Sequence, residues 1–127
     1  MQIRAKQGCG CSPAAKFIFP CSGSSDVGEL TDRVSRELTR QGAGKMFCLA
    51  GIGGGVSGIV ESTKAASKVL VIDGCGLDCA KKTMEKGGFQ KFEYIRLSDM
   101  GLEKGKSPVS SENIVLVMNK AKEALAC

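Results

Sequence analysis

Four cysteine residues lie at comparable positions along the sequence and supply thiolates that can bind a soft metal ion. Each of the first three lies at or just past the end of a short apolar segment. The fourth follows the third by four residues, a spacing that places two side chains on one face of a helix. Thiolates select zinc, copper(I) or an iron–sulfur cluster and disfavour calcium and magnesium. The candidate ligands are Cys21, Cys48, Cys75 and Cys79.

The absence of histidine narrows the chemistry of such a site. Neither a Ser-His-Asp triad nor a Cys-His pair can form, so a metal site must be built from thiolates and carboxylates. With four thiolates and no histidine we expect zinc, with copper(I) or an iron–sulfur cluster as alternatives. Four thiolates complete the tetrahedral shell of zinc, so a metal-bound water for hydrolysis is not expected.

Two other uses of the cysteines stay open. Cys75 and Cys79, near a helix start, can act as nucleophile and resolving partner in a thiol-dependent redox or sulfur-transfer enzyme, with Asp73 orienting or tuning the pair. Alternatively, the protein stores or delivers a metal ion, and Cys9 and Cys11 form a mobile landing site. Without that role, Cys9 and Cys11 are expected to be a solvent-exposed, redox-sensitive pair.

The elements that must position these cysteines are alternating strands and helices. Short apolar runs predict four strands, at Lys16–Pro20, Lys45–Ala50, Lys68–Asp73 and Phe92–Leu97. A segment with helical spacing follows each strand. These helices are expected to start at Asp26 with a capping-box partner at Glu29, at Ser57, near Cys75, and at Ser107-Pro108, with a glycine-rich turn at Gly51–Gly55 and a loop at Ser98–Lys106.

This repeat predicts an α/β fold, a three-layer αβα sandwich with a four-stranded parallel sheet of the Rossmann or flavodoxin type. Right-handed crossovers leave few strand orders, and we expect 2-1-3-4. The carboxyl ends of the strands then bring Cys21, Cys48 and Cys75 to one edge. Neighbouring strands are about 4.8 Å apart, and sulfurs around zinc are roughly 3.8 Å apart, so modest loop adjustment suffices. Helix N-termini directed at this edge favour thiolates.

Two weaker motifs lie beside the cysteines. Gly53, Gly55 and Gly58 have the spacing of a dinucleotide-binding loop, but too little chain follows to hold a second nucleotide, so we interpret them as a glycine-rich turn. The segment Cys21–Asp26 is typical of an anion-binding turn. A cysteine phosphatase would need arginine where this chain has Val27, which argues against that activity.

Length and composition bound the remaining interpretation. A chain of 127 residues predicts one domain, which we place at residues 16–127 after a flexible cysteine-containing arm at residues 1–15. The apolar runs are far shorter than a membrane span, and the first residues lack the apolar core of a secretory signal, so we expect a cytoplasmic protein with no membrane partner. The net charge of +5 is scattered and aromatic residues are few, which disfavours nucleic-acid binding.

Three segments, taken in order, carry a recognisable pattern that covers nearly the whole chain from Lys16 onward. They are Phe19–Gly23 with Asp26–Gly28, then Cys48–Gly53, then Ile72–Cys75 with Cys79. Together they resemble the DGC domain family of zinc-binding proteins. The resemblance implies four zinc-binding cysteines, matched here by Cys21, Cys48, Cys75 and Cys79, and it implies no established activity. The Cys9-Gly10-Cys11 tripeptide lies outside the matched core.

Overall fold

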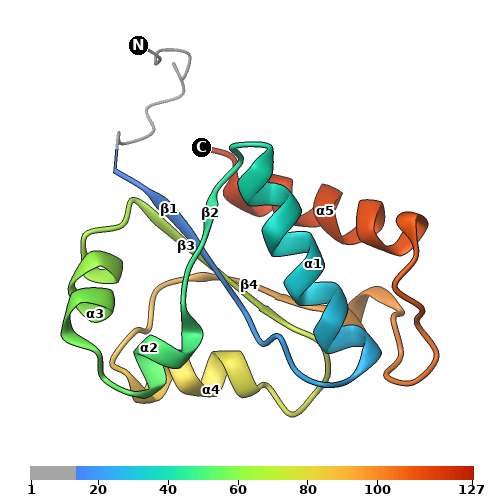
Figure 1. Cartoon of the computed structure of the whole chain (residues 1–127), viewed down its shortest axis with the longest axis horizontal. Coiled ribbons are helices and arrows are strands. Elements are labelled where there is room, and N and C mark those ends of the chain that lie inside the picture. The colour runs from blue at the N-terminus through green and yellow to red at the C-terminus, as the bar shows by residue number, and fades with distance from the viewer. Residues whose placement is uncertain (1–13) are drawn as a thin grey trace.

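The computed structural model describes residues 14–127, which form a parallel four-stranded sheet covered by helices (Figure 1). The strands are β1 (Lys16–Pro20), β2 (Lys45–Met46), β3 (Lys68–Asp73) and β4 (Glu93–Arg96). The helices are α1 (Asp26–Arg40), α2 (Leu49–Gly53), α3 (Ser57–Lys64), α4 (Cys79–Lys86) and α5 (Ser111–Leu125). The sheet order is β2-β1-β3-β4 and every pair is parallel, which confirms the predicted α/β class and strand order.

Alternate residues of the central strands pack into two separate apolar cores. Ile18 of β1 and Ile72 of β3 lie in the core beneath α1 and α5. Phe19 and Val71, their neighbours in sequence, lie in the core beneath α2 and α4. Successive side chains of a strand point to opposite faces, so a strand that is apolar throughout must be covered on both sides. The helices therefore flank the sheet in the predicted three layers.

Helix α1 begins at Asp26 as predicted, but its N-cap and the start of α5 differ from the sequence prediction. Ser25, not Asp26, is the N-cap of α1, and its Oγ accepts a hydrogen bond from the Gly28 N–H at 3.1 Å. The Asp26 carboxylate instead accepts from a distant loop, at the N–H groups of Gly105 and Ser107. Helix α5 begins after Ser110, whose Oγ caps Asn113, so the predicted start at Ser107-Pro108 is wrong.

Strand β2 is shorter than predicted because the chain enters α2 early. The Phe47 ring stacks on that of Phe17 at a centroid distance of 4.1 Å, and α2 follows directly after Cys48. Gly51, expected in a turn, is buried inside α2, where a Cβ would collide with the Ile59 side chain of α3. Close packing of two short helices outweighs the low helix propensity of glycine. Helix α3 begins at Ser57, as predicted, and Val56 precedes that helix as its N-cap.

The chain between β3 and α5 brings two further corrections. Helix α4 begins at Cys79, so Cys75 lies on the preceding loop and not on the helix itself. The predicted loop Ser98–Lys106 starts with a 3-10 helix, Leu97–Met100. Most of the predicted arm, with Cys9 and Cys11, lies outside the described residues. At its end, the Ser67 N–H donates to the Ala15 carbonyl at 2.9 Å. Across residues 14–127, no helix is both long and apolar enough to cross a membrane.

Candidate metal centre

The four predicted ligands lie at the carboxyl edge of the sheet, in the lower part of Figure 1. Cys21 is the first residue after β1, Cys48 precedes α2, and Cys75 is the second residue after β3. Cys79 is the first residue of α4. All four are free thiols, and Cys48 and Cys79 are exposed while the other two are half-buried. Parallel strand direction thus gives the cysteines a common edge, as the sequence predicted.

Cys21 is held by contacts with both β3 and α1. Its N–H donates to the Ile72 carbonyl at 3.0 Å, which continues the ladder between β1 and β3. Its Sγ lies 3.5 Å from Thr31 Oγ1. The next residue, Ser22, has a φ of 52°, in the left-handed region, and its N–H donates to the same Thr31 hydroxyl at 3.1 Å. The strained turn is therefore fixed by α1 and keeps the Cys21 sulfur at the sheet edge.

Two neighbouring pockets open at this edge, and Cys21 lines both of them. Cys21, Cys75 and Cys79 line one pocket of about 300 Å³, called here the Cys75 pocket. Cys21 and Cys48 line the other, of about 510 Å³, called here the Cys48 pocket. The structure therefore brings three predicted ligands to the Cys75 pocket. The fourth, Cys48, lines the neighbouring pocket, and Cys21 lines both.

The donor set suits zinc, but its ligands are not gathered into one coordination group. In the part of the chain described, no three Cys, His, Asp or Glu side chains lie close enough together to hold a metal ion. Four thiols without histidine are a donor set typical of structural zinc sites. Cys48 and Cys79 are exposed, Cys48 as the N-cap of α2 and Cys79 as the first residue of α4. The ligand assignment stays a prediction.

Asp73 is a residue whose structural role the sequence did not reveal. It is the last residue of β3, and its side chain is buried. Its carboxylate accepts hydrogen bonds from the N–H groups of Ala80 at 2.8 Å and Lys81 at 2.9 Å. These are first-turn amides of α4, which a helix leaves without internal partners. Asp73 therefore caps α4 from the end of β3 and fixes the helix that begins with Cys79.

Close packing against α1 explains why the middle residue of the Asp-Gly-Cys tripeptide is glycine. A Cβ at Gly74 would lie 2.8 Å from Val27 Cγ2 and 3.1 Å from the Gly28 nitrogen, both in the first turn of α1. Only glycine lets the end of β3 approach that turn. The three residues 73–75 therefore have separate tasks, since Asp73 caps α4, Gly74 packs on α1 and Cys75 lines the pocket.

A network from β4 holds the residue that precedes Cys79. Asp78 has a φ of 55°, and its carboxylate accepts from Arg96 Nε and from Arg96 Nη2, both at 2.7 Å. The Tyr94 hydroxyl lies 2.8 Å from Asp73 Oδ2 and 3.0 Å from Asp78 Oδ1, and shares its proton between them. The Arg96 hydrogen bonds hold the pKa of Asp78 below its ordinary value. Burial, followed by the Asp73 hydrogen bond, raises the pKa of Tyr94.

A cation from a distant loop completes the Cys75 pocket. The Lys104 ammonium lies 4.0 Å from Cys75 Sγ and lines the pocket. Its loop is attached to α1 through Asp26, which accepts from Gly105 and Ser107 N–H groups at 2.9 Å each. These two hydrogen bonds lower the pKa of Asp26. Asp26 therefore positions the segment that brings Lys104 to the thiols.

Sequence reasoning missed Asp78, Tyr94, Arg96 and Lys104 as residues of this site. Tyr94 and Arg96 are two residues apart on a strand, so a shared face was readable from the pattern. The Lys104 contact depends on the hydrogen bond between the Asp26 carboxylate and the Gly105 N–H, and no local sequence pattern predicts a contact between residues so far apart in the chain.

Fold and site together define a small αβα sandwich with a thiol-lined sheet edge. The DGC domain model matches residues 17–121, and the chain belongs to the DGC domain family. A curated relative is the anaerobic and virulence modulator AnvM of Pseudomonas aeruginosa, which is 32% identical over 88 residues, covering 69% of this chain and 67% of the relative. No solved structure matches the chain.

Proposed function

We propose that this protein is a cytoplasmic zinc-binding protein whose ligands are Cys21, Cys48, Cys75 and Cys79. The observation that carries the proposal is the double position of Cys21, which lines the pocket of Cys75 and Cys79 as well as that of Cys48. Cys21 therefore lies next to Cys48 on one side and to Cys75 and Cys79 on the other. When bound, a zinc ion with four thiolates supplies a structural cross-link between chain segments.

The surrounding residues support a thiolate site on electrostatic grounds. Four thiolates around one zinc ion leave an excess of negative charge, which the Lys104 ammonium beside Cys75 partly offsets. Asp73 and the pair of Asp78 with Arg96 hold the segment between β3 and α4 in place. Zinc binding then requires ordering mainly at Cys48 and at the exposed side chain of Cys79.

Metal content of protein purified without added metal tests the proposal. We expect about one zinc ion per chain, and we expect Cys75→Ser and Cys48→Ser each to lose it. Ser24→Ala is the matched control, because Ser24 lines the Cys75 pocket without a sulfur and should leave the zinc in place. Copper, or iron with the visible absorbance of an iron–sulfur cluster, would change the metal but keep the ligands. Full zinc retention by Cys75→Ser would refute the ligand set.

A second function, thiol-dependent redox transfer, is favoured by the contact between Lys104 and Cys75. In that reaction the Cys75 thiolate attacks a disulfide substrate and releases one thiolate. Cys79 then displaces the second thiolate and forms a disulfide with Cys75, so the substrate gains two electrons and the protein loses them. Metal-poor protein in which Cys79→Ser traps a mixed disulfide would support this function over zinc binding.

Metal storage or delivery is a third candidate, and it depends on Cys9 and Cys11, which lie outside the described residues. Deletion of residues 1–12 should then slow zinc uptake without changing the final zinc content. An unchanged uptake rate would argue against delivery.

A further inference from the structure

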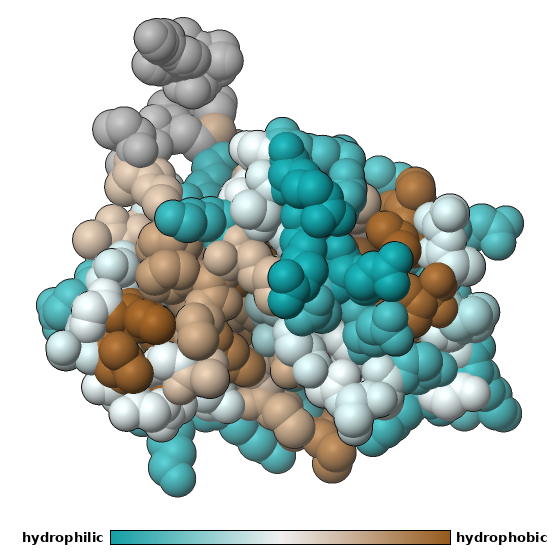
Figure 2. All heavy atoms as spheres, viewed as in Figure 1, coloured by the Kyte–Doolittle hydropathy of each residue, from teal (hydrophilic) through white to brown (hydrophobic). Residues whose placement is uncertain are grey.

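The Cys48 pocket combines an apolar floor with one charged wall. Its floor includes Pro20, Met46, Phe47 and Leu49, and α1 supplies Asp32 and Arg36. Its volume of about 510 Å³ lies in the range typical of small-molecule sites. Figure 2 shows hydrophilic side chains gathered along α1, beside a more apolar surface over β2, α2 and α3. A ligand that fills this pocket therefore meets both apolar and charged groups.

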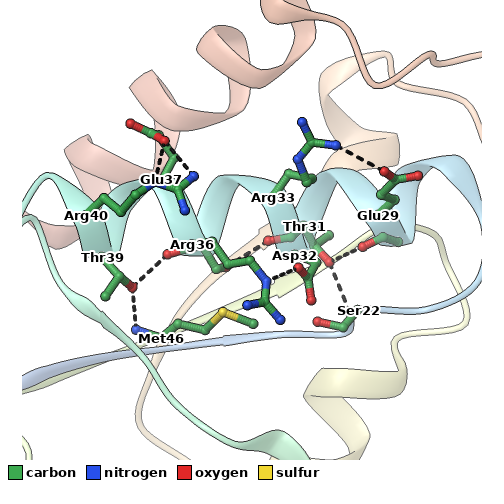
Figure 3. Close-up of polar contacts among 12 residues, drawn as sticks. Ser22, Glu29, Thr31, Asp32, Arg33, Arg36, Glu37, Thr39, Arg40 and Met46 are labelled. Carbon is green, nitrogen blue, oxygen red and sulfur yellow. Dashed lines mark hydrogen bonds and ion pairs between the residues drawn. The ribbon is translucent and has the colours of Figure 1, made fainter.

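The positive charge of this wall comes from Arg36. Figure 3 shows its guanidinium between Met46 and Ser22, on the side of α1 that faces β2. Arg36 Nε donates to Asp32 Oδ1, and among residues 14–127 Asp32 is its sole hydrogen-bond partner. The two Nη groups, which carry the guanidinium's paired donors, are left for a ligand.

Asp32 fixes the direction of this guanidinium. Partial burial works to raise the pKa of Asp32, but hydrogen bonds from Arg36 and from the Ser22 side chain outweigh it and hold that pKa below its ordinary value. Asp32 therefore stays ionised at neutral pH and keeps Arg36 directed along the pocket wall. A guanidinium held in this way loses less rotational freedom when it binds a second anion.

Arg33 provides an internal comparison on the same helix. It pairs with Glu29 four residues earlier, just as Arg36 pairs with Asp32. Both side chains are more than half exposed, at 52% and 58%. Arg33 does not line the Cys48 pocket, and in Figure 3 it points to the opposite side of α1. The two arginines therefore differ in position while matching in charge, exposure and pairing.

We propose that the Cys48 pocket binds a small organic carboxylate with an apolar tail, with the carboxylate on the Nη groups of Arg36 and the tail on Met46 and Phe47. Guanidinium matches a carboxylate with two parallel hydrogen bonds, which gives the ligand its orientation. The apolar floor disfavours a fully hydrated inorganic anion, because such an ion would lose water there without compensation. The carboxylate is held by Arg36 and not by a metal ion, but Cys21 and Cys48 line the same pocket, so binding is measured on protein samples of equal zinc content.

Binding is tested with hexanoate and with hexanamide, its uncharged counterpart of the same shape. The readout is the carbon-13 methyl signal of methionine, since Met46 lines the pocket whereas Met84 and Met118 are buried elsewhere. We expect hexanoate to shift the Met46 signal in a saturable way and to bind more tightly than hexanamide. Arg36→Gln should weaken hexanoate binding by about fivefold, the effect of losing one exposed charge pair. Arg33→Gln should leave binding unchanged.

Several outcomes would overturn the proposal. Equal affinity for hexanoate and hexanamide would show that no anion is recognised, and equal losses in Arg36→Gln and Arg33→Gln would show only a general charge effect. A saturable shift at Met84 or Met118 with none at Met46 would place the ligand elsewhere. Absence of any shift in the wild-type protein would rule the site out. Unchanged signals of the buried Met84 and Met118 in both variants without ligand confirm that they remain folded.

Discussion

Replacing Asp73 by asparagine tests whether the end of β3 caps α4. The carboxylate of Asp73 accepts hydrogen bonds from the Ala80 and Lys81 N–H groups and from the Tyr94 hydroxyl. Asparagine offers one acceptor oxygen in place of two, and its NH₂ group would face a backbone N–H donor. One buried amide then loses its partner, and the remaining hydrogen bonds lose their charge.

The size of the effect follows from these contacts. An unsatisfied buried amide costs about 1 to 3 kcal/mol, and loss of a helix cap about 1 kcal/mol, so we expect Asp73→Asn to lower the free energy of unfolding by about 3 kcal/mol. For a domain of this size, that loss corresponds to roughly 10 °C in the melting temperature. Urea unfolding and thermal melting followed by circular dichroism measure both quantities.

Asp99→Asn is the matched control. The Asp99 carboxylate lies 3.1 Å from Arg96 at the border of the same network, but its side chain is 65% exposed. Its loss should cost less than about 0.5 kcal/mol. A loss below about 1 kcal/mol for Asp73→Asn, or equal losses for the two variants, would refute the capping role.

Three further predictions follow from the same region. Gly74→Ala should lower the urea midpoint strongly, because the new Cβ would lie 2.8 Å from Val27 Cγ2. Gly76→Ala is its control and should change the midpoint little, because a Cβ at Gly76 would have no heavy atom within 4 Å. Equal midpoints for the two variants would contradict the packing of Gly74 on α1. The pKa of Asp26 is lowered in the folded protein, so its stabilisation is present at neutral pH and lost as the pH falls through that lowered value. Asp26→Asn should therefore reduce the acid sensitivity of unfolding and speed amide exchange at Ser107, and unchanged exchange would contradict the tether. Chelation of the proposed zinc should lower the melting temperature, and re-addition should restore it; a melting temperature indifferent to chelator would argue against a structural metal.

Sequence patterns predicted those parts of the fold that depend on local periodicity. The run Lys68–Asp73 is apolar on both faces, and it became β3, covered on both sides. The rules for parallel crossovers leave few strand orders and need no side-chain detail, and the expected order 2-1-3-4 is the one observed. Placement of Cys21, Cys48 and Cys75 at one edge came from the same argument.

The remaining differences arise where contacts between distant residues outweigh local preference. Gly51 entered α2 because Ile59 of another helix packs on it, and no window around Gly51 contains that information. Helix α4 starts at Cys79 because Asp73 holds its first turn, so the two cysteines expected on one helix lie on a loop and a helix. Whether all four thiols share one metal depends on side-chain rotations that periodicity does not encode.

The hydrogen bonds of Asp73 to Ala80 and Lys81 close the stretch from residue 73 to residue 81 into a ring. Cys75 and Cys79 are carried on this ring, so the entropy of bringing its ends together is lost when the protein folds. A thiol-seeking ligand that arrives later has only their side-chain torsions to restrict. Because the ring is already closed, Cys75 and Cys79 would bind such a ligand first, and Cys48 would bind it afterwards from a separate segment of the chain.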